Sequence, residues 1–403
     1  MVLRLFITLF LASSSALALV NSVDRVQKGG VGAGRCFSRG FARACPHRLY
    51  TKGGVGAGRC FSRGFGRACP HRLYATAQEI IDKPAWAGND DLLSKFVNSL
   101  IGFKPLFSVM KVMARNTLIS TAEKNGIPWR ERAASLKSQQ SQLDAYFEAV
   151  NIPEIRYPEY YTREFHAYDE GNLNWLAASE CESATYSMAL RVWPNDGLTA
   201  AQAQDRLRFS FLDEVNAYLK SKGVASPKSI IDVGCSVGVS TDYLARFFPG
   251  AEKILGLDLS AHFLAVAKQR QDSAGINDDI GLSRISWKHA KVEESNLPAG
   301  EFDLTSVSFM FHELPQKESS EIVQELYRIT RKGGVVAITD NNPRSPVIQG
   351  LPPALFTLMK STEPHSDEYY TFDLEGSLLL AGFSDVKTVA SDPRHRTILA
   401  FKN

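Results

Sequence analysis

From residue 227 onward, short apolar runs alternate with longer segments whose apolar residues recur at helical spacing. Such alternation predicts an α/β fold, a parallel sheet with crossover helices. The last two apolar runs follow each other closely, so we expect one hairpin-like reversal. The strands are predicted at 229–233, 253–257, 285–289, 302–309, 334–339, 384–390 and 397–402. The helices are predicted at 240–248, 261–272, 317–331 and 374–381.

The segment before this domain, residues 78–226, has mainly helical periodicity and is predicted to form an N-terminal cap. Residues 91–122 mix apolar residues at near-helical spacing with lysine and arginine, and Pro105 interrupts the pattern. They form either a cap helix packed on the sheet domain or a basic face that makes peripheral contact with a membrane. A helix predicted at 198–221 leads directly into the first strand.

Aromatic and polar side chains are dense in residues 157–168, and residues 171–184 continue the polar character. Tyrosine, histidine, arginine and tryptophan at this density suit a surface that covers a ligand. They equally suit a rigid structural cap whose hydroxyl groups are satisfied.

The N-terminal residues have the composition of targeting segments. Residues 1–20 join a basic residue to an apolar core and small residues, as a signal peptide does. Residues 21–77 are rich in arginine and glycine, contain no acid after Asp24 and repeat 28–51 almost unchanged as 52–75. This arrangement resembles the bipartite presequences that route proteins into plastids, as in some algae. A secretory protein with a basic propeptide and a mitochondrial presequence are the alternatives.

The 403 residues, 44% apolar and 22% charged, have the composition of an ordinary globular protein. The net charge of +3 arises from the basic first 75 residues, so we expect no nucleic-acid partner. Four of the six cysteines lie in that part without a Cys-x-x-Cys spacing, and no metal site is predicted. Cys181 and Cys235 alone cannot form a disulfide framework, which indicates a reduced, intracellular or organellar body. Nothing in the sequence indicates the oligomeric state.

A glycine turn follows the first predicted strand, before a helical pattern begins. Gly234 and Gly238 let the backbone approach a ligand closely, and the helix start presents free N–H groups. The order Asp-x-Gly-x-Ser-x-Gly differs from the dinucleotide fingerprint Gly-x-Gly-x-x-Gly. The carboxylate of Asp232 would repel a pyrophosphate but would accept hydrogen bonds from a ligand with an ammonium group and no phosphate. S-adenosylmethionine has that chemistry.

The run Asp232-Val-Gly-Cys-Ser-Val-Gly238 resembles motif I of the class I S-adenosylmethionine-dependent methyltransferases. The resemblance covers about residues 227–403 and is closest to the type 11 group of small-molecule methyltransferases. Residues 157–213 and the loop 312–315 are also similar to plant and algal plastid members. The resemblance implies a seven-stranded, mostly parallel, Rossmann-like sheet with S-adenosylmethionine as cofactor. The loop residues it assigns to the cofactor are Asp232, Gly234, Cys235, Ser236 and Gly238.

Ligands of open α/β sheets bind outside the carboxyl ends of the strands. After the second strand, Asp258 and Leu259 are predicted to contact the cofactor, with the acid holding both ribose hydroxyls. Asp258 lies near the ~20 residues from the loop expected of a ribose-binding acid. The alternative is a helix cap, a role that Ser260 also suits.

After the third strand, the resemblance implies an acid on the adenine amino group, but Lys291 occupies the equivalent position. Val292 or Glu293 is therefore the predicted adenine contact, and Glu293 is our choice.

After the fourth strand, His312 faces the methyl group and the acceptor in the resemblance. With a near-neutral pKa it would deprotonate a hydroxyl or an activated carbon. Alternatively, His312 and Glu313 only shape the loop, since methyl transfer from a sulfonium needs little beyond positioning. The insertion after Asp340, through residue 370, commonly forms an acceptor lid in the family. Its Leu, Phe and Met content suits a hydrophobic acceptor, lipid-like or aromatic, and equally suits ordinary helix packing.

These residues predict a methyltransferase that acts on an O or C centre of a hydrophobic small molecule. Two alternatives stay open. A methyltransferase-like binding protein would keep the loop without turnover, and a nicotinamide-dependent oxidoreductase would use the same sheet, although the Asp232 and Ser236 loop argues against it.

Overall fold

The computed structural model describes residues 104–403 except 167, 225, 275–280 and 352–362, and leaves the side chains of 104–111, 113 and 114 undescribed. The predicted signal peptide, the transit-like segment, residues 78–103 of the cap and the core of the predicted acceptor lid lie outside the described residues. Those assignments stay predictions, as does the plastid destination.

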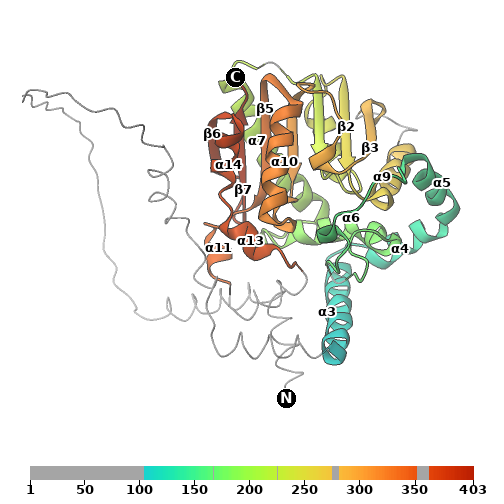
Figure 1. Cartoon of the computed structure of the whole chain (residues 1–403). Coiled ribbons are helices and arrows are strands. Elements are labelled where there is room, and N and C mark those ends of the chain that lie inside the picture. Colours follow the sequence, from blue (N-terminus) through green and yellow to red (C-terminus); the bar gives the residue numbers. More distant parts are fainter. Residues whose placement is uncertain (1–103, 167, 225, 275–280, 352–362) are drawn as a thin grey trace, which may run out of the picture. The chain divides into compact units, whose positions relative to one another are not determined.

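Seven strands form one sheet in the order β3-β2-β1-β4-β5-β7-β6 (Figure 1). Neighbouring strands from β3 to β5 are parallel, and β7 runs antiparallel to both β5 and β6. The seven-stranded, mostly parallel sheet and its single reversal are therefore confirmed. The strands are β1 Ser229–Val233, β2 Lys253–Asp258, β3 Ile285–His289, β4 Phe302–Ser308, β5 Thr330–Asn341, β6 Ser384–Ala390 and β7 His395–Phe401.

Helices cover both faces of the sheet (Figure 1). Because side chains alternate along a strand, Ile230 packs against one helical layer and Ile231 against the other. The first layer contains α7 Ala200–Ser221, α8 Val239–Phe247 and α9 Ala261–Ala274. The second contains α10 Gln316–Ile329 and α14 Leu374–Ala381.

The helix predicted at 317–331 ends earlier, because Thr330 already belongs to β5 and pairs with Phe302. Thr330 is β-branched and has extended backbone angles, and its hydroxyl donates to the Leu326 carbonyl at 2.6 Å. Its side chain thus satisfies a carbonyl of the last helical turn while the backbone has turned into the strand.

The described part of the cap is mainly helical. Its elements are α3 Lys104–Lys124, α4 Trp129–Ser138, α5 Gln140–Val150, η3 Glu159–Tyr161 and α6 Trp175–Leu190. Pro105 lies in the first turn of α3, where a missing N–H costs nothing, and the part of the predicted pattern that precedes it lies outside the described residues. Among the described residues, no helix has the length and apolar character needed to cross a membrane.

The cap contacts the carboxyl ends of three adjacent strands. The Ile152 N–H donates to His289 Nδ1 at 2.9 Å after β3, and Ser260 Oγ donates to the Asn172 carbonyl at 2.7 Å after β2. Cys181 Sγ of α6 lies 3.0 Å from Ser236 Oγ after β1. The cap therefore lies over the edge where a ligand of such a sheet binds.

We predict that Gly238→Ala lowers the free energy of unfolding by about 1–2 kcal/mol or more, the cost of a left-handed non-glycine residue. Gly238 has a φ of +81°, and an added Cβ would lie 2.5 Å from the Trp287 ring. Gly250→Ala is the matched control, because its Cβ would only reach Ser226 at 3.5 Å. Urea unfolding of both variants measures the difference, and equal stability would contradict the assignment of the loop geometry.

Candidate active site

The loop between β1 and α8 adopts left-handed backbone angles at three alternate residues. Gly234, Ser236 and Gly238 have φ values of +70°, +52° and +81°. The N–H groups of Gly234 and Cys235 both donate to the Leu257 carbonyl, at 2.8 and 3.0 Å. An added Cβ at Gly234 would lie 2.6 Å from Met310 Sδ, so the loop after β4 packs directly on this loop. A side chain at Gly238 would clash with the Trp287 ring, and a side chain at Gly234 would require Met310 to move.

The carboxylate of Asp258, at the end of β2, fixes this loop from the neighbouring strand. Its Oδ2 accepts from the Ser236 N–H at 2.7 Å, and its Oδ1 accepts from the Ser260 N–H at 2.8 Å. Burial raises the pKa of Asp258 to about 6, against the opposing effect of these N–H groups. Ser260, and not Asp258, caps α9, because its Oγ accepts from the Phe263 N–H at 3.3 Å. The Asp258 carboxylate thus joins the loop after β1 to the segment that precedes α9.

Asp232 is more enclosed than its predicted role in ligand binding requires. It is fully buried, and its Oδ2 accepts from Ser240 Oγ at 2.6 Å and from Thr241 Oγ1 at 2.7 Å. Burial raises the pKa of Asp232 to about 6. Its Oδ1 has no hydrogen-bond partner among the described residues. Oδ2 therefore fixes the start of α8, whereas Oδ1 can accept a hydrogen bond from a further group.

The side chains of two other predicted cofactor residues, Cys235 and Leu259, lie in the protein core. Cys235 is buried with its Sγ directed at Gly256, where an added Cβ would meet it at 3.0 Å. Leu259 is buried as well, and its carbonyl lies 3.0 Å from His289 Nε2. Any contact of these two residues with a ligand is then made largely through their backbone.

Glu293 lies after β3 in the short helix η6 Val292–Glu294. Its Oε1 accepts from the Tyr160 hydroxyl of the cap at 2.8 Å. Burial raises the pKa of Glu293. Val292, the alternative adenine contact, packs into the core. Of the two predicted adenine contacts, Val292 and Glu293, Glu293 is thus the one with a polar side chain.

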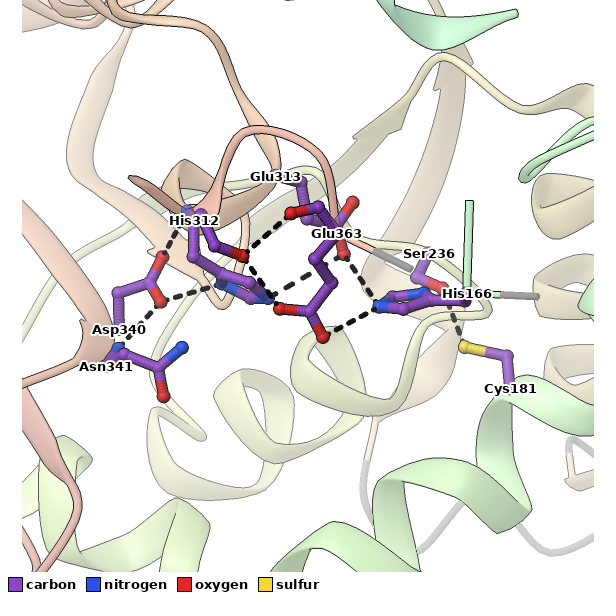
Figure 2. Close-up of polar contacts among 9 residues, drawn as sticks. His166, Cys181, Ser236, His312, Glu313, Asp340, Asn341 and Glu363 are labelled. Atoms are coloured by element: carbon purple, nitrogen blue, oxygen red, sulfur yellow. Dashed lines mark hydrogen bonds and ion pairs between the residues drawn. The ribbon is translucent and has the colours of Figure 1, made fainter. Parts of the chain in front are cut away.

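His312 lies after β4 in η7 Phe311–Glu313, beside the end of β5. Its Nδ1 donates to Asp340 Oδ1 at 2.8 Å, and its backbone N–H donates to Asp340 Oδ2 at 3.2 Å (Figure 2). The ring of Tyr369 meets the imidazole edge-on, with 6.4 Å between ring centroids. Sequence reasoning noted Asp340 only as a strand end. The parallel pairing of β4 with β5 is what makes it the partner of His312.

The expected near-neutral pKa of His312 is wrong. Burial lowers this pKa, but the charge of Asp340, its hydrogen bond and the nearby Glu313 and Glu363 raise it to about 10. Burial also acts on Asp340, where the charge and hydrogen bond of His312 lower the pKa overall. The sequence could not reveal this shift, because the aspartate lies 28 residues away.

Sequence reasoning also missed His166 and Glu363. His166 Nε2 lies 4.0 Å from Glu313 Oε1 and 3.7 Å from Glu363 Oε1, and His312 Nε2 lies 4.0 Å from Glu313 Oε1. Figure 2 shows the two glutamates between the two histidines. Burial raises the pKa of Glu313 to about 8. The cap thus contributes directly to the polar surroundings of His312.

No group of three or more His, Cys, Asp or Glu side chains within the described ranges has an arrangement that would hold a metal ion. The polar side chains gathered here can orient a ligand, hold charge and move protons.

Comparison with known proteins places a domain in this part of the chain. Residues 230–334 match a family model described as a methyltransferase domain. An uncharacterised protein of Synechococcus sp. is 42% identical over 85 residues, which are 21% of this chain and 19% of that protein. Demethylmenaquinone methyltransferase of Lactiplantibacillus plantarum is 25% identical over 171 residues, 41% of this chain and 69% of that enzyme.

Among solved structures, a SAM-dependent methyltransferase from Aquifex aeolicus is 21% identical with a TM-score of 0.37. The match covers 48% of this chain and 91% of that one. A TM-score of this size carries no conclusion about the reaction.

We predict that the pKa of His312, followed by its imidazole signals in NMR spectra across pH, lies well above the ordinary value of about 6.5. In Asp340→Asn the carboxylate charge is gone and the imidazolium loses its main partner, so this pKa falls toward the ordinary value. His312→Gln identifies the signal. An unchanged pKa in Asp340→Asn would show that another group controls the histidine.

Proposed function

We propose that this chain, which contains a class I S-adenosylmethionine-dependent methyltransferase domain, transfers a methyl group to an O or C centre of a hydrophobic small molecule. One observation carries the proposal. The glycine loop fixed by Asp258 and the His312–Asp340 pair follow strands of one sheet edge, β1 and β2 on one side and β4 and β5 on the other. A donor site and a proton acceptor are thus brought together.

The residues present suit the methyl donor. Gly234 and Gly238 keep side chains away from the loop, and Asp258 would hold the ribose. The unpartnered Oδ1 of Asp232 suits an ammonium group, and Glu293 suits the adenine amino group. When bound, S-adenosylmethionine supplies an electrophilic methyl group on its sulfonium.

His312 is suited to take a proton from the acceptor. Asp340 occupies Nδ1 and fixes the ring, which leaves Nε2 as the nitrogen that would face the acceptor. Asp340 raises the pKa of His312, so the unprotonated imidazole is a stronger base than an ordinary histidine and lies closer in pKa to a phenol, at about 10, than an ordinary histidine does. An aliphatic alcohol, which is far less acidic, has no such match. Phenols and enol-like carbon acids are therefore the acceptors that this pair would activate.

A similar acceptor class is named in one relative, the demethylmenaquinone methyltransferase. A reduced quinone combines a phenol-like hydroxyl with an apolar body. That combination supports a hydrophobic aromatic acceptor for this chain, on either its oxygen or an adjacent ring carbon.

We predict that isothermal titration of S-adenosylmethionine shows binding to the wild-type protein and none to Gly234→Val. The valine would clash with Met310 and strain a backbone at φ +70°. Gly250→Val is the matched control. Asp258→Ala should also abolish detectable binding, because the variant loses both the predicted ribose contact and the anchor of Ser236. Circular dichroism must show folded variants, and a wild-type protein that does not bind the donor would refute the proposal.

We predict that formation of S-adenosylhomocysteine, measured with a panel of phenols and reduced quinones, increases with pH toward about 10. His312 acts as a base only when unprotonated, and its raised pKa places this form at alkaline pH. His312→Gln should lower kcat by about 10²–10⁴-fold, the usual contribution of a general base, and leave the affinity for the donor unchanged.

Mass spectrometry of the product should show one added CH₂. Donor binding without S-adenosylhomocysteine formation from any acceptor would favour the binding-protein alternative. Binding of a nicotinamide cofactor instead of the donor would favour the oxidoreductase.

A further inference from the structure

Two carboxylates and a second histidine lie beside Nε2 of His312. Its Nδ1 is occupied by Asp340, and its Nε2 lies 4.0 Å from Glu313 Oε1. The same glutamate oxygen lies 4.0 Å from Nε2 of His166, and this nitrogen also lies 3.7 Å from Glu363 Oε1. Figure 2 shows that these side chains follow one another from Asp340 to His166. Together they form a row of groups that can each hold a proton.

Exposure to solvent increases along this row. The side chain of His312 is 13% exposed, that of Glu313 is 24% exposed and that of His166 is 40% exposed. The proposed base is therefore enclosed, whereas the histidine of the cap is open to water. A proton that moves from His312 to His166 passes from the interior of the site to the surface.

The backbone of the cap holds His166 at this place. Phe165 and Tyr168 exchange two backbone hydrogen bonds, of 3.1 and 2.8 Å, and these close the turn that contains His166. His166 has a left-handed φ of +50°, which costs a non-glycine residue about 1–2 kcal/mol. The Phe165 ring lies against the imidazole, with 3.9 Å between the ring centroids. The fold thus maintains a strained backbone that brings a titratable side chain to the site, which is common for functional residues.

The distances along the row suit proton transfer through Glu313. The terminal torsion of a glutamate has a broad energy minimum, so a small rotation brings its carboxylate within hydrogen-bonding distance of either imidazole. An ionised Glu313 takes the proton from His312 and then gives it to His166. A neutral Glu313 first gives its own proton to His166 and then takes the replacement from His312. Either order moves one proton outward and restores Glu313.

The base needs such a route after each turnover. Methyl transfer leaves the proton of the acceptor on His312 Nε2, and the next acceptor needs this nitrogen unprotonated. Burial lowers the pKa of His312, but the charge and hydrogen bond of Asp340 raise it overall. The imidazolium therefore holds its proton more tightly than an ordinary histidine does, and it returns the proton to water more slowly.

We propose that Glu313 and His166 relay the proton of the acceptor from His312 to water. The inference rests on the proposed function and adds the residues that regenerate the base between turnovers. The bond between the acceptor and its proton breaks, and an N–H bond forms at His312 Nε2. The proton then moves through the Glu313 carboxylate to His166 Nε2 and into solvent. Glu363 balances the positive charge of His166 while it holds the proton.

A single turnover tests the relay, because formation of S-adenosylhomocysteine and appearance of the proton in solution are timed in the same reaction. The acceptor is the phenol or reduced quinone with which the wild-type protein forms S-adenosylhomocysteine fastest, and a pH-indicator dye in weak buffer reports the proton. In wild type we expect both products to appear together. In His166→Asn and in Glu313→Gln the proton should appear about 10-fold later or more, since a positioned proton-transfer group contributes about 10²–10⁴-fold. Asparagine tolerates the left-handed backbone of His166 but carries no proton.

His262→Asn is the matched control. It removes a histidine that packs against the rings of Phe147 and Trp175, and it should show no delay. Added imidazole buffer should shorten the delay of His166→Asn in proportion to its concentration and leave wild type unchanged. A small base can replace the missing side chain there, because this end of the row is exposed.

The delay is measured against S-adenosylhomocysteine within each variant, so it separates a relay from a change in the shape of the site. Slower methyl transfer without a delay would mean that Glu313 and His166 only support the site. Unchanged methyl transfer without a delay would mean that the proton leaves by another route. Either result overturns the inference while the proposed function stands. If wild type forms no S-adenosylhomocysteine with any acceptor of the panel, the proposed function fails and the relay fails with it.

Discussion

The site depends on one constraint, the hydrogen bond by which the Asp258 carboxylate fixes the loop after β1. Ser236 is a non-glycine residue with a left-handed backbone, a conformation that costs about 1–2 kcal/mol. Its N–H donates to a buried carboxylate, and a hydrogen bond to a charged group contributes about 1.5–3 kcal/mol, enough to hold that conformation. The loop is therefore shaped by a residue of the neighbouring strand as much as by its own glycines. The same carboxylate is the one proposed to hold the ribose of the donor, so loop geometry and donor binding would be coupled through Asp258.

The cap contributes side chains to the site. Tyr160 contacts Glu293, Cys181 contacts Ser236, and His166 approaches Glu313. These three contacts reach the ends of β3, β1 and β4. The matched family region, residues 230–334, contains neither His166 nor Asp340. A ligand bound at this edge would thus meet groups from before and after the matched region.

The sequence predicted the sheet well. The spacing of apolar residues shows which side chains of a strand or helix are buried, and that spacing can be read within a short segment. The same spacing located the residues at the strand ends. It did not reveal which groups those residues contact. Asp232 was expected to face a ligand, but its carboxylate accepts from the hydroxyl groups of Ser240 and Thr241. These two residues begin the helix that follows the loop, so the sequence already offered them as partners. The pairing of His312 with Asp340 had no signal in the sequence, because it follows from which strands are neighbours.

The ionisation of Glu313 bears on how His312 can serve an acceptor. If Glu313 were ionised at neutral pH, its carboxylate, 4.0 Å from Nε2, would compete with an acceptor oxygen for the free N–H of the imidazolium. Burial raises the pKa of Glu313 to about 8 and so keeps most of this group neutral there. The imidazolium is then balanced by Asp340 on one side and keeps Nε2 for an incoming oxygen on the other. A phenol that binds beside Nε2 would give its proton to this nitrogen only when the imidazole is unprotonated, and the phenolate so formed, paired with the new imidazolium, is the nucleophile that methyl transfer to oxygen or to a ring carbon would use.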